Sequence, residues 1–105
     1  MNAATLISES KPVYTQLCSR LHVARLELFG SGTRSDFDVA HSDLDFVVSF
    51  SPDKHVSLAD RYLELAEGLE RIFNRKVDLL TEGAIRNPIL KASIEKSKKL
   101  VYAGS

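Results

Sequence analysis

Two aspartates separated by one residue are the first feature of this sequence that could do chemistry. Asp43 and Asp45 lie at the head of an apolar segment, residues 44–50, which alternates as a strand does. Both carboxylates would therefore lie on one face of a strand, with Cα atoms roughly 6.5–7 Å apart. At about 6 Å and an effective dielectric of about 20 they would repel by about 3 kcal/mol, so a cation between them would be stabilising. Mg²⁺ is the natural candidate for carboxylate oxygens. The alternative is an exposed loop residue followed by a strand residue that faces water.

A third aspartate, Asp78, lies in another apolar segment, residues 76–81, which is also expected to form a strand. A charged side chain there is costly to bury without a partner. If this strand pairs beside residues 44–50, Asp78 approaches Asp43 and Asp45, and three carboxylates line one end of a sheet. Such a set is typical of metal-assisted phosphoryl and nucleotidyl transfer, in which an acid can also accept the proton of an attacking hydroxyl. The alternative for Asp78 is an edge-strand residue that faces water.

A glycine turn directly follows the first expected strand. Gly30 allows a tight turn and a close approach of the backbone to a ligand, and Ser31 begins the next element. Backbone N–H groups and a hydroxyl would then point toward an anion, which suits a triphosphate. Arg34 could reach a phosphate, or it could pair with one of the acids that follow it, Asp36 or Asp38. An ordinary strand-to-helix turn is the alternative.

The elements that must position these residues follow from periodicity and capping. Val13, Leu17 and Leu21 recur at helical spacing after Pro12 and predict a helix with these three on its apolar face. The expected strands are residues 23–29, 44–50 and 76–81, and residues 100–102 are either a short strand or simply packing. The other expected helices are a short one from about residue 31, one capped by Ser57 that runs to about Phe73, and one that begins at Asn87-Pro88 and runs to about Lys98 or Lys99. This alternation predicts an α/β (α+β) fold, with a small mixed sheet of three to four strands flanked by helices.

The composition limits the classes of protein that this chain can be. Its 105 residues suit one domain spanning residues 1–105, and 14 basic against 14 acidic residues give a net charge of zero. That balance argues against an extended nucleic-acid surface, and no apolar run approaches the ~20 residues of a membrane span. A single cysteine, Cys18, fits a reduced, cytoplasmic setting. The C-terminal lysines are expected to form a solvated face or to meet an acidic partner: Lys91, Lys96, Lys98 and Lys99.

Read together, two segments resemble the nucleotidyltransferase superfamily that includes DNA polymerase β. Residues 28–34 contain the Gly-Ser turn, and residues 42–48 contain two aspartates that are each followed by a hydrophobic residue. The small chain is similar to the minimal nucleotidyltransferases of prokaryotes, and the resemblance covers roughly residues 12–102. It implies a polymerase β-like nucleotidyltransferase fold.

The resemblance also implies a role for each matching residue. Gly30 and Ser31 would hold the β- and γ-phosphates of an incoming nucleotide. Asp43 and Asp45 would ligate Mg²⁺, and Asp78 would be the third carboxylate of the metal and catalytic set. All three acids are present, which favours an active site.

Arg34 matches an arginine of the family, but the glycine that follows it in the family pattern is Ser35 here. A serine at this position can tighten the loop without abolishing binding. The departure therefore bears on nucleotide affinity more than on the fold.

Many minimal nucleotidyltransferases resemble antitoxins that pair with a HEPN-domain ribonuclease toxin and transfer AMP from ATP to a tyrosine of that toxin. The resemblance therefore implies a Mg²⁺-dependent transferase that moves AMP from ATP to a hydroxyl of a partner protein, with a HEPN toxin as that partner. Two alternatives stay open. One is a non-catalytic antitoxin that neutralises its toxin by direct contact, and the other is a free-standing transferase that acts on a small-molecule alcohol.

Overall fold

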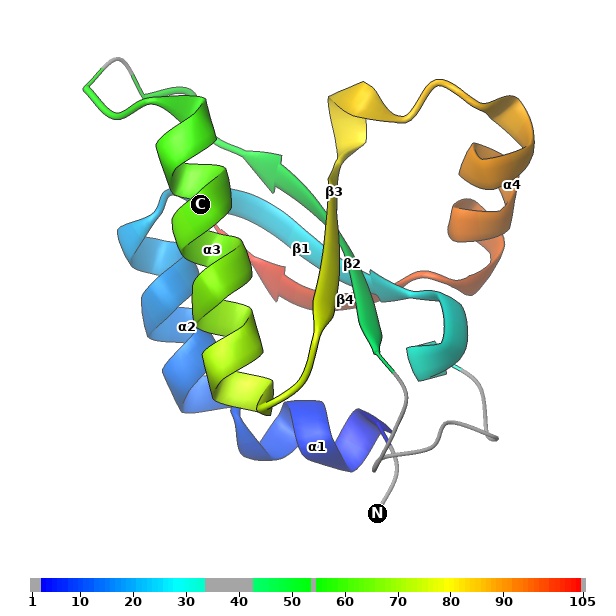
Figure 1. Ribbon diagram of the computed structural model, residues 1–105, viewed down its shortest axis with the longest axis horizontal. Helices are drawn as coiled ribbons and strands as arrows, with labels where there is room; N and C mark the ends of the chain where they lie inside the picture. The colour runs from blue at the N-terminus through cyan, green and yellow to red at the C-terminus, as the bar shows by residue number, and fades with distance from the viewer. Residues whose placement is uncertain (1–2, 34–42, 54, 105) are drawn as a thin grey trace.

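The computed structural model describes residues 3–33, 43–53 and 55–104 (Figure 1). The N-terminal half contains helices α1 (Ala3–Glu9) and α2 (Lys11–Arg20), strand β1 (Val23–Phe29), the short 3₁₀ helix η1 (Gly30–Thr33) and strand β2 (Leu44–Phe50). The C-terminal half contains helix α3 (Leu58–Phe73), strand β3 (Val77–Thr81), the 3₁₀ helix η2 (Glu82–Ala84), helix α4 (Pro88–Ser97) and strand β4 (Lys99–Ala103). The expected strands at residues 23–29 and 44–50 are confirmed to the residue.

The strands form one mixed sheet in the order β3-β2-β1-β4. β1 pairs antiparallel with both β2 and β4, whereas β2 and β3 run parallel. The parallel pair needs a crossover, and α3 supplies it by carrying the chain from the end of β2 back to the start of β3. The sheet and its flanking helices confirm the predicted fold class. The last residues form a strand that pairs with β1, so packing alone does not describe them.

One face of the sheet packs against α2 and α3 and forms the hydrophobic core (Figure 1). Alternate strand residues supply the sheet side of this core, as the side-chain period of two requires. They are Leu26 and Leu28 of β1, Leu44, Phe46 and Val48 of β2, and Val77 and Leu79 of β3. The residues between them point to the opposite face, which is the face that carries Asp45 and Asp78.

The apolar face of α2 differs from the one expected from the sequence. Val13 is 56% exposed, whereas Tyr14, Cys18 and Leu21 are buried. The large ring of Tyr14 sets this orientation, because its Oη reaches across to donate a hydrogen bond to the carbonyl oxygen of Val101 in β4 at 3.1 Å. The expectation that Val13 lies on the apolar face was therefore wrong, and the next residue, Tyr14, takes that place.

The crossover helix α3 is fixed at both ends. The Oγ of Ser57 accepts a hydrogen bond from the backbone N–H of Asp60 at 3.2 Å, and Asn74 ends the helix in the left-handed region at φ 51°. Both are favourable terminal signals. Near the first turn, buried Arg61 donates through Nη1 to the carbonyl oxygen of Ser51 at 2.8 Å. These contacts hold the crossover that brings β3 beside β2.

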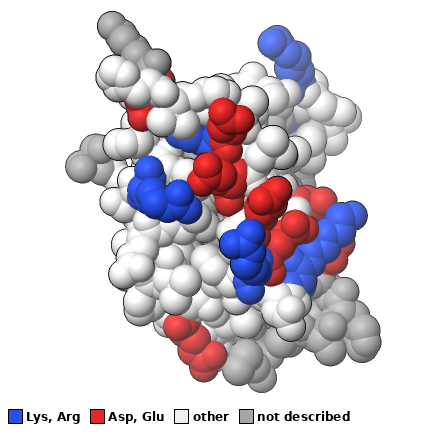
Figure 2. Space-filling model, turned by 60° about the vertical axis from the view of Figure 1, so that its left-hand side comes forward, with Lys and Arg blue, Asp and Glu red and all other residues white. Residues whose placement is uncertain are grey.

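The solvent side of these helices carries charges of both signs. Arg20 of α2 and Glu64 of α3 form an exposed ion pair, with Nη1 and Oε2 3.0 Å apart. Figure 2 shows acidic and basic side chains lying next to one another on the face that it presents, with no broad basic area among the residues drawn there. None of the helices in the described ranges is both long and apolar enough to cross a membrane.

The opposite face of the sheet is partly covered by α4 (Figure 1). Val47 of β2 and Ile94 of α4 are both buried, and both line a small gap between the sheet and the helix. The predicted start of α4 is confirmed, because the Oδ1 of Asn87 accepts hydrogen bonds from the N–H groups of Ile89 and Leu90, with Pro88 as the first helical residue. α4 therefore lies on the same side of the sheet as Asp45 and Asp78.

Candidate active site

The carboxylates meet through the pairing of β2 with β3. Asp45 and Asp78 are Cα partners in this parallel register, and both point away from the core face. Neighbouring strands lie about 4.8 Å apart, so two residues at the same level present their side chains side by side. Asp43 is exposed and directly precedes β2. The pairing confirms the condition on which the sequence prediction for Asp78 depended.

Gly30 lies against one of these carboxylates. It follows Phe29, the residue of β1 whose Cα partner is Asp45. A Cβ atom built on Gly30 would lie 2.6 Å from Oδ2 of Asp45, and Gly30 has a φ of +72°. A side chain at this position would therefore collide with the carboxylate and would also strain the backbone. Glycine is required here because the turn and Asp45 are in contact.

The turn itself is tied down by side-chain hydroxyls. Thr33 Oγ1 donates to the carbonyl oxygen of Gly30 at 2.7 Å, which closes η1 on itself. The backbone N–H of Gly30 donates to the Oγ of Ser97, the last residue of α4, at 3.4 Å. The sequence indicated the glycine turn but gave no sign that the end of α4 contacts it.

Two of the predicted phosphate contacts lie outside what the structure describes. Arg34 is not among the described residues, nor is the side chain of Ser31, although the backbone of Ser31 lies within η1. Their roles stay predictions. Gly30, Asp45 and Asp78 are the predicted site residues that the described part of the chain brings together, and Asp43 adjoins them by sequence.

The donor set fits a magnesium ion that shares its coordination with substrate. Within the described ranges no group of three or more His, Cys, Asp or Glu residues converges closely enough to hold a metal by itself. Mg²⁺ in phosphate-handling sites is commonly held by one or two carboxylates together with water and substrate phosphates, so a complete protein cage is not needed. Asp45 and Asp78, paired across two strands on one face, supply carboxylate oxygens of that kind.

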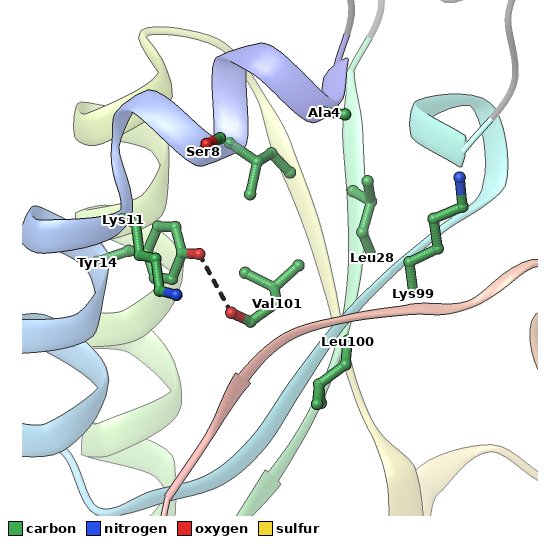
Figure 3. Close-up of a pocket in the computed structure, with 9 residues that line it drawn as sticks. Ala4, Ser8, Lys11, Tyr14, Leu28, Lys99, Leu100 and Val101 are labelled. Carbon is green, nitrogen blue, oxygen red and sulfur yellow. Dashed lines mark hydrogen bonds between the residues drawn. The ribbon is translucent and has the colours of Figure 1, made fainter.

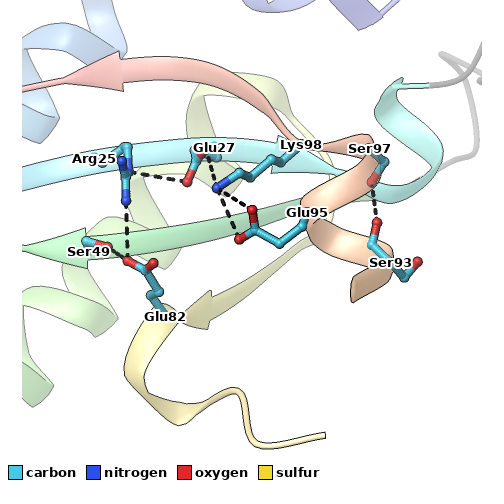
Figure 4. Close-up of polar contacts among 8 residues, drawn as sticks. All are labelled: Arg25, Glu27, Ser49, Glu82, Ser93, Glu95, Ser97 and Lys98. Carbon is cyan, nitrogen blue, oxygen red and sulfur yellow. Dashed lines mark hydrogen bonds and ion pairs between the residues drawn. The ribbon is translucent and has the colours of Figure 1, made fainter. Parts of the chain in front are cut away.

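A network of charged residues occupies the same sheet face farther along β1. Glu27 is buried, and its two oxygens contact different cations: Arg25 Nε lies 3.3 Å from Oε1 and Lys98 Nζ lies 3.4 Å from Oε2 (Figure 4). Lys98 also contacts Glu95 at 3.2 Å, and this hydrogen bond together with the charge of Glu27 raises the pKa of Lys98. Lys98 was expected on a solvated face or against an acidic partner. Its side chain is instead 25% exposed and fastens the end of α4 to β1.

A second branch of this network reaches the end of β3. Ser49 of β2 donates a hydrogen bond to Oε2 of Glu82 in η2, and Arg25 Nη2 lies 3.7 Å from the same oxygen (Figure 4). The Ser49 hydrogen bond and the Arg25 charge lower the pKa of Glu82. The sequence did not predict this network, since its members come from segments that are distant along the chain.

The other side of the sheet holds a pocket of about 320 Å³ between α1, α2 and β4 (Figure 3). Its lining is mainly apolar and includes Ile7, Leu28, Leu100 and Val101, with the hydrogen bond from Tyr14 to Val101 beside it. None of the three site aspartates lines this pocket. It therefore belongs to the packing of α1 against the sheet and is separate from the candidate active site.

Comparison with known proteins identifies the fold and the class. The family model of the nucleotidyltransferase domain matches residues 13–101. A protein of Methanocaldococcus jannaschii named "putative protein adenylyltransferase" is 41% identical over 86 residues, which are 82% of each chain. A solved structure described as a "putative minimal nucleotidyltransferase" has 27% identity and a TM-score of 0.65, and the match covers 94% of this chain and 95% of the other.

The same fold occurs in a toxin-antitoxin complex. A chain from the structure of a tri-AMPylated Shewanella oneidensis HEPN toxin in complex with an MNT antitoxin has a TM-score of 0.63, with coverage of 93% of this chain and 73% of the other. Its sequence identity is 17%, so this likeness concerns the fold alone. With the extent of the family match, these findings show that the chain belongs to the nucleotidyltransferase domain family. The resemblance inferred from the sequence is confirmed, and the protein is a nucleotidyltransferase.

Proposed function

We propose that this nucleotidyltransferase is a Mg²⁺-dependent protein adenylyltransferase, which transfers AMP from ATP to a hydroxyl of a partner protein. The observation that carries the proposal is the juxtaposition of Asp45 with Asp78 across β2 and β3, with Gly30 packed against the Asp45 carboxylate. Carboxylates beside a glycine turn are the groups needed to hold a metal–triphosphate and to accept a proton.

The proposed step is an in-line displacement at phosphorus. The hydroxyl oxygen of the acceptor forms a bond to the α-phosphorus of ATP, and the bond from that phosphorus to the bridging oxygen breaks. Pyrophosphate leaves with the electron pair of that bond. The proton of the hydroxyl passes to a carboxylate. Asp78 is the candidate, because its side chain is exposed on the sheet face opposite the hydrophobic core. The product is an AMP ester of the acceptor.

The remaining residues of the site would bind the nucleotide. Asp43 and Asp45, with Asp78, would hold Mg²⁺, which neutralises phosphate charge when it is bound. Gly30 and Ser31 would form the turn that holds the β- and γ-phosphates, as the family resemblance implies. Arg34 would add a cation to the same phosphates.

A HEPN-domain toxin is the partner that we propose. The support is the name of the Methanocaldococcus jannaschii relative, a protein adenylyltransferase, together with the fold shared with the MNT antitoxin complex. We place the activity in the cytoplasm, because the buried free thiol of Cys18 suits a reducing compartment.

The first test measures ATP binding by calorimetric titration, with and without Mg²⁺. We expect saturable binding that requires Mg²⁺ and that falls at least about tenfold in the variant with Asp43→Asn and Asp45→Asn, since each change removes a carboxylate ligand. Glu67→Gln is the matched control, because it removes a carboxylate from the exposed side of α3. Equal ATP affinity in the double variant and in the control would contradict the proposed site.

The second test measures transfer of labelled AMP to a candidate HEPN toxin. The double variant should lose at least about 100-fold in rate, by analogy with removal of groups that stabilise a transition state, while still forming a complex with the toxin. If the variant neutralises the toxin as well as the wild-type chain does, the non-catalytic antitoxin is the correct description. If AMP reaches small alcohols but no protein, the free-standing transferase is correct.

A further inference from the structure

The C-terminal end of α4 is attached to β1 and also to the glycine turn that follows β1. Lys98 contacts the buried carboxylate of Glu27 (Figure 4). Ser97 accepts the hydrogen bond from the N–H of Gly30. Glu27 and Gly30 are three residues apart on the same strand and its turn. These two contacts therefore hold the end of α4 beside the end of β1 and the glycine turn that follows it.

The hydroxyl of Ser97 acts as both acceptor and donor. While its Oγ accepts from Gly30, the same hydroxyl donates to the carbonyl oxygen of Ser93 at 3.2 Å (Figure 4). The second hydrogen bond fixes the direction of the hydroxyl proton and turns a lone pair of Oγ toward Gly30. A hydroxyl oxygen can accept one hydrogen bond and donate another, whereas an alanine side chain can do neither.

Gly30 needs this support because it has no side chain of its own. Its φ of +72° and its close approach to Asp45 disfavour a Cβ atom, so no side-chain contact of its own helps to hold it against Asp45. Glycine also loses more conformational freedom than any other residue when it is ordered. Its two backbone polar groups are both used: Thr33 of the same turn donates to the carbonyl oxygen, and the N–H donates to Ser97 at the end of α4.

We propose that Ser97 is a positioning residue for nucleotide binding, which holds the glycine turn against Asp45 through the N–H of Gly30. The inference rests on the proposed function and adds to it a residue that does not belong to the family motif. Ser97 acts through Gly30 and not on the reacting atoms. Its loss should therefore weaken the binding of ATP and leave the chemical step unchanged at saturating ATP.

The test compares three variants in the full chain. Ser97→Ala removes the hydroxyl, Ser97→Thr keeps it, and Ser93→Ala is the matched control, since Ser93 takes part through its backbone carbonyl alone. We expect Ser97→Ala to raise the KM and the Kd for ATP about three- to tenfold, the range for one lost hydrogen bond. The kcat at saturating ATP and the KM for the acceptor should stay within about twofold. Ser97→Thr should restore ATP affinity, and Ser93→Ala should match the wild-type chain.

A second readout does not depend on nucleotide. Hydrogen exchange of the Gly30 amide should be faster in Ser97→Ala than in the wild-type chain or in Ser93→Ala, because its acceptor is gone. Unchanged exchange and unchanged ATP affinity in Ser97→Ala would overturn the inference, as would tighter ATP binding, which would mean that Ser97 competes with phosphate. Failure of the wild-type chain to bind ATP would instead overturn the proposed function, whatever Ser97→Ala does to the exchange of Gly30.

Discussion

The sheet face opposite the hydrophobic core carries two groups of residues, and their carboxylates have different surroundings. The charged end consists of Arg25, Glu27, Glu82, Glu95 and Lys98, and each of its carboxylates contacts a cation. The carboxylate end consists of Gly30, Asp43, Asp45 and Asp78, and there two carboxylates of like charge are opposite one another across neighbouring strands. β1 contributes Glu27 to the charged end, and Gly30 of η1, which directly follows β1, belongs to the carboxylate end.

We infer that the charged end stabilises the fold and that the carboxylate end is the part that we propose to bind the metal and the nucleotide. At the charged end, neutralisation within the chain lets Glu27 be buried and fastens α4 and η2 to the sheet. At the carboxylate end, like charges held close together favour a bound cation. Substitutions at the charged end should therefore lower the stability of the fold, whereas substitutions at the carboxylate end should lower nucleotide binding and AMP transfer.

The largest effect in this comparison is expected from Gly30→Ala. The added methyl group collides with Oδ2 of Asp45 and forces a non-glycine residue into a positive φ, which costs about 1–3 kcal/mol in the free energy of unfolding. Displacement of the turn by about 1 Å should also lower the rate of AMP transfer by about 100-fold. Thermal unfolding and single-turnover transfer measure the two losses.

Gly83→Ala is the matched control for this substitution. A Cβ atom at Gly83 meets no heavy atom within 4 Å, so the same chemical change should alter stability by less than about 0.5 kcal/mol. If both variants lose transfer to the same extent, the contact between Gly30 and Asp45 does not set the geometry of the site.

The charged end should respond in stability. Glu27→Gln removes a buried charge that two cations share, and we expect a loss of about 1–2 kcal/mol in the free energy of unfolding, from weakened charge-assisted hydrogen bonds. Glu95→Gln changes an exposed carboxylate that contacts the same Lys98, and it should cost less than about 0.5 kcal/mol. Urea unfolding at neutral pH compares them. Equal losses would mean that burial of Glu27 contributes nothing.

The smallest effect is a pH dependence that comes from Glu82. The Ser49 hydrogen bond and Arg25 hold the pKa of Glu82 below its ordinary value near 4.5 in the folded chain. A lowered pKa contributes stability above the unfolded value, and this contribution is lost as the pH falls through the folded value. Because Glu82 is about half exposed, the contribution at neutral pH should be less than about 1 kcal/mol.

Unfolding of the wild-type chain and of Glu82→Gln as a function of pH tests this dependence. The difference in stability between the two should be present at pH 7 and should close as the pH falls through the lowered pKa of Glu82 in the folded chain. Ser49→Ala should reduce the difference, since it removes the largest cause of the lowered pKa. A difference that stays constant with pH would show that Glu82 contributes through packing alone.

Local signals predicted most of the elements of this fold. Alternation delimited β1 and β2, and the caps at Ser57 and Asn87 marked the starts of α3 and α4, because these patterns depend on residues within one turn or one strand. Which side of α2 packs against the core, and whether β4 pairs with β1, depend on contacts between residues that are distant in the chain. Val13 was therefore assigned to the wrong side, and the terminal strand was left open as an alternative.

The candidate site divides in the same way. The spacing of Asp43 and Asp45 and the glycine turn were visible in the sequence because they are local. The role of Asp78 depended on whether β3 pairs with β2, which the crossover through α3 decides. Lys98 and Ser97 carried no sequence signal beyond residue type, because each contacts β1 or its turn from about 70 residues away along the chain.

The sequence by itself determined the class of this protein, because the motifs that carry the family resemblance, the glycine turn and the two aspartates, are defined by local spacing. The tertiary structure alone decided that Asp78 is level with Asp45, that Gly30 contacts the Asp45 carboxylate, and that the end of α4 is fastened to β1. Strand pairing and helix docking bring together groups that are distant in the chain, and local propensity does not encode which distant groups meet.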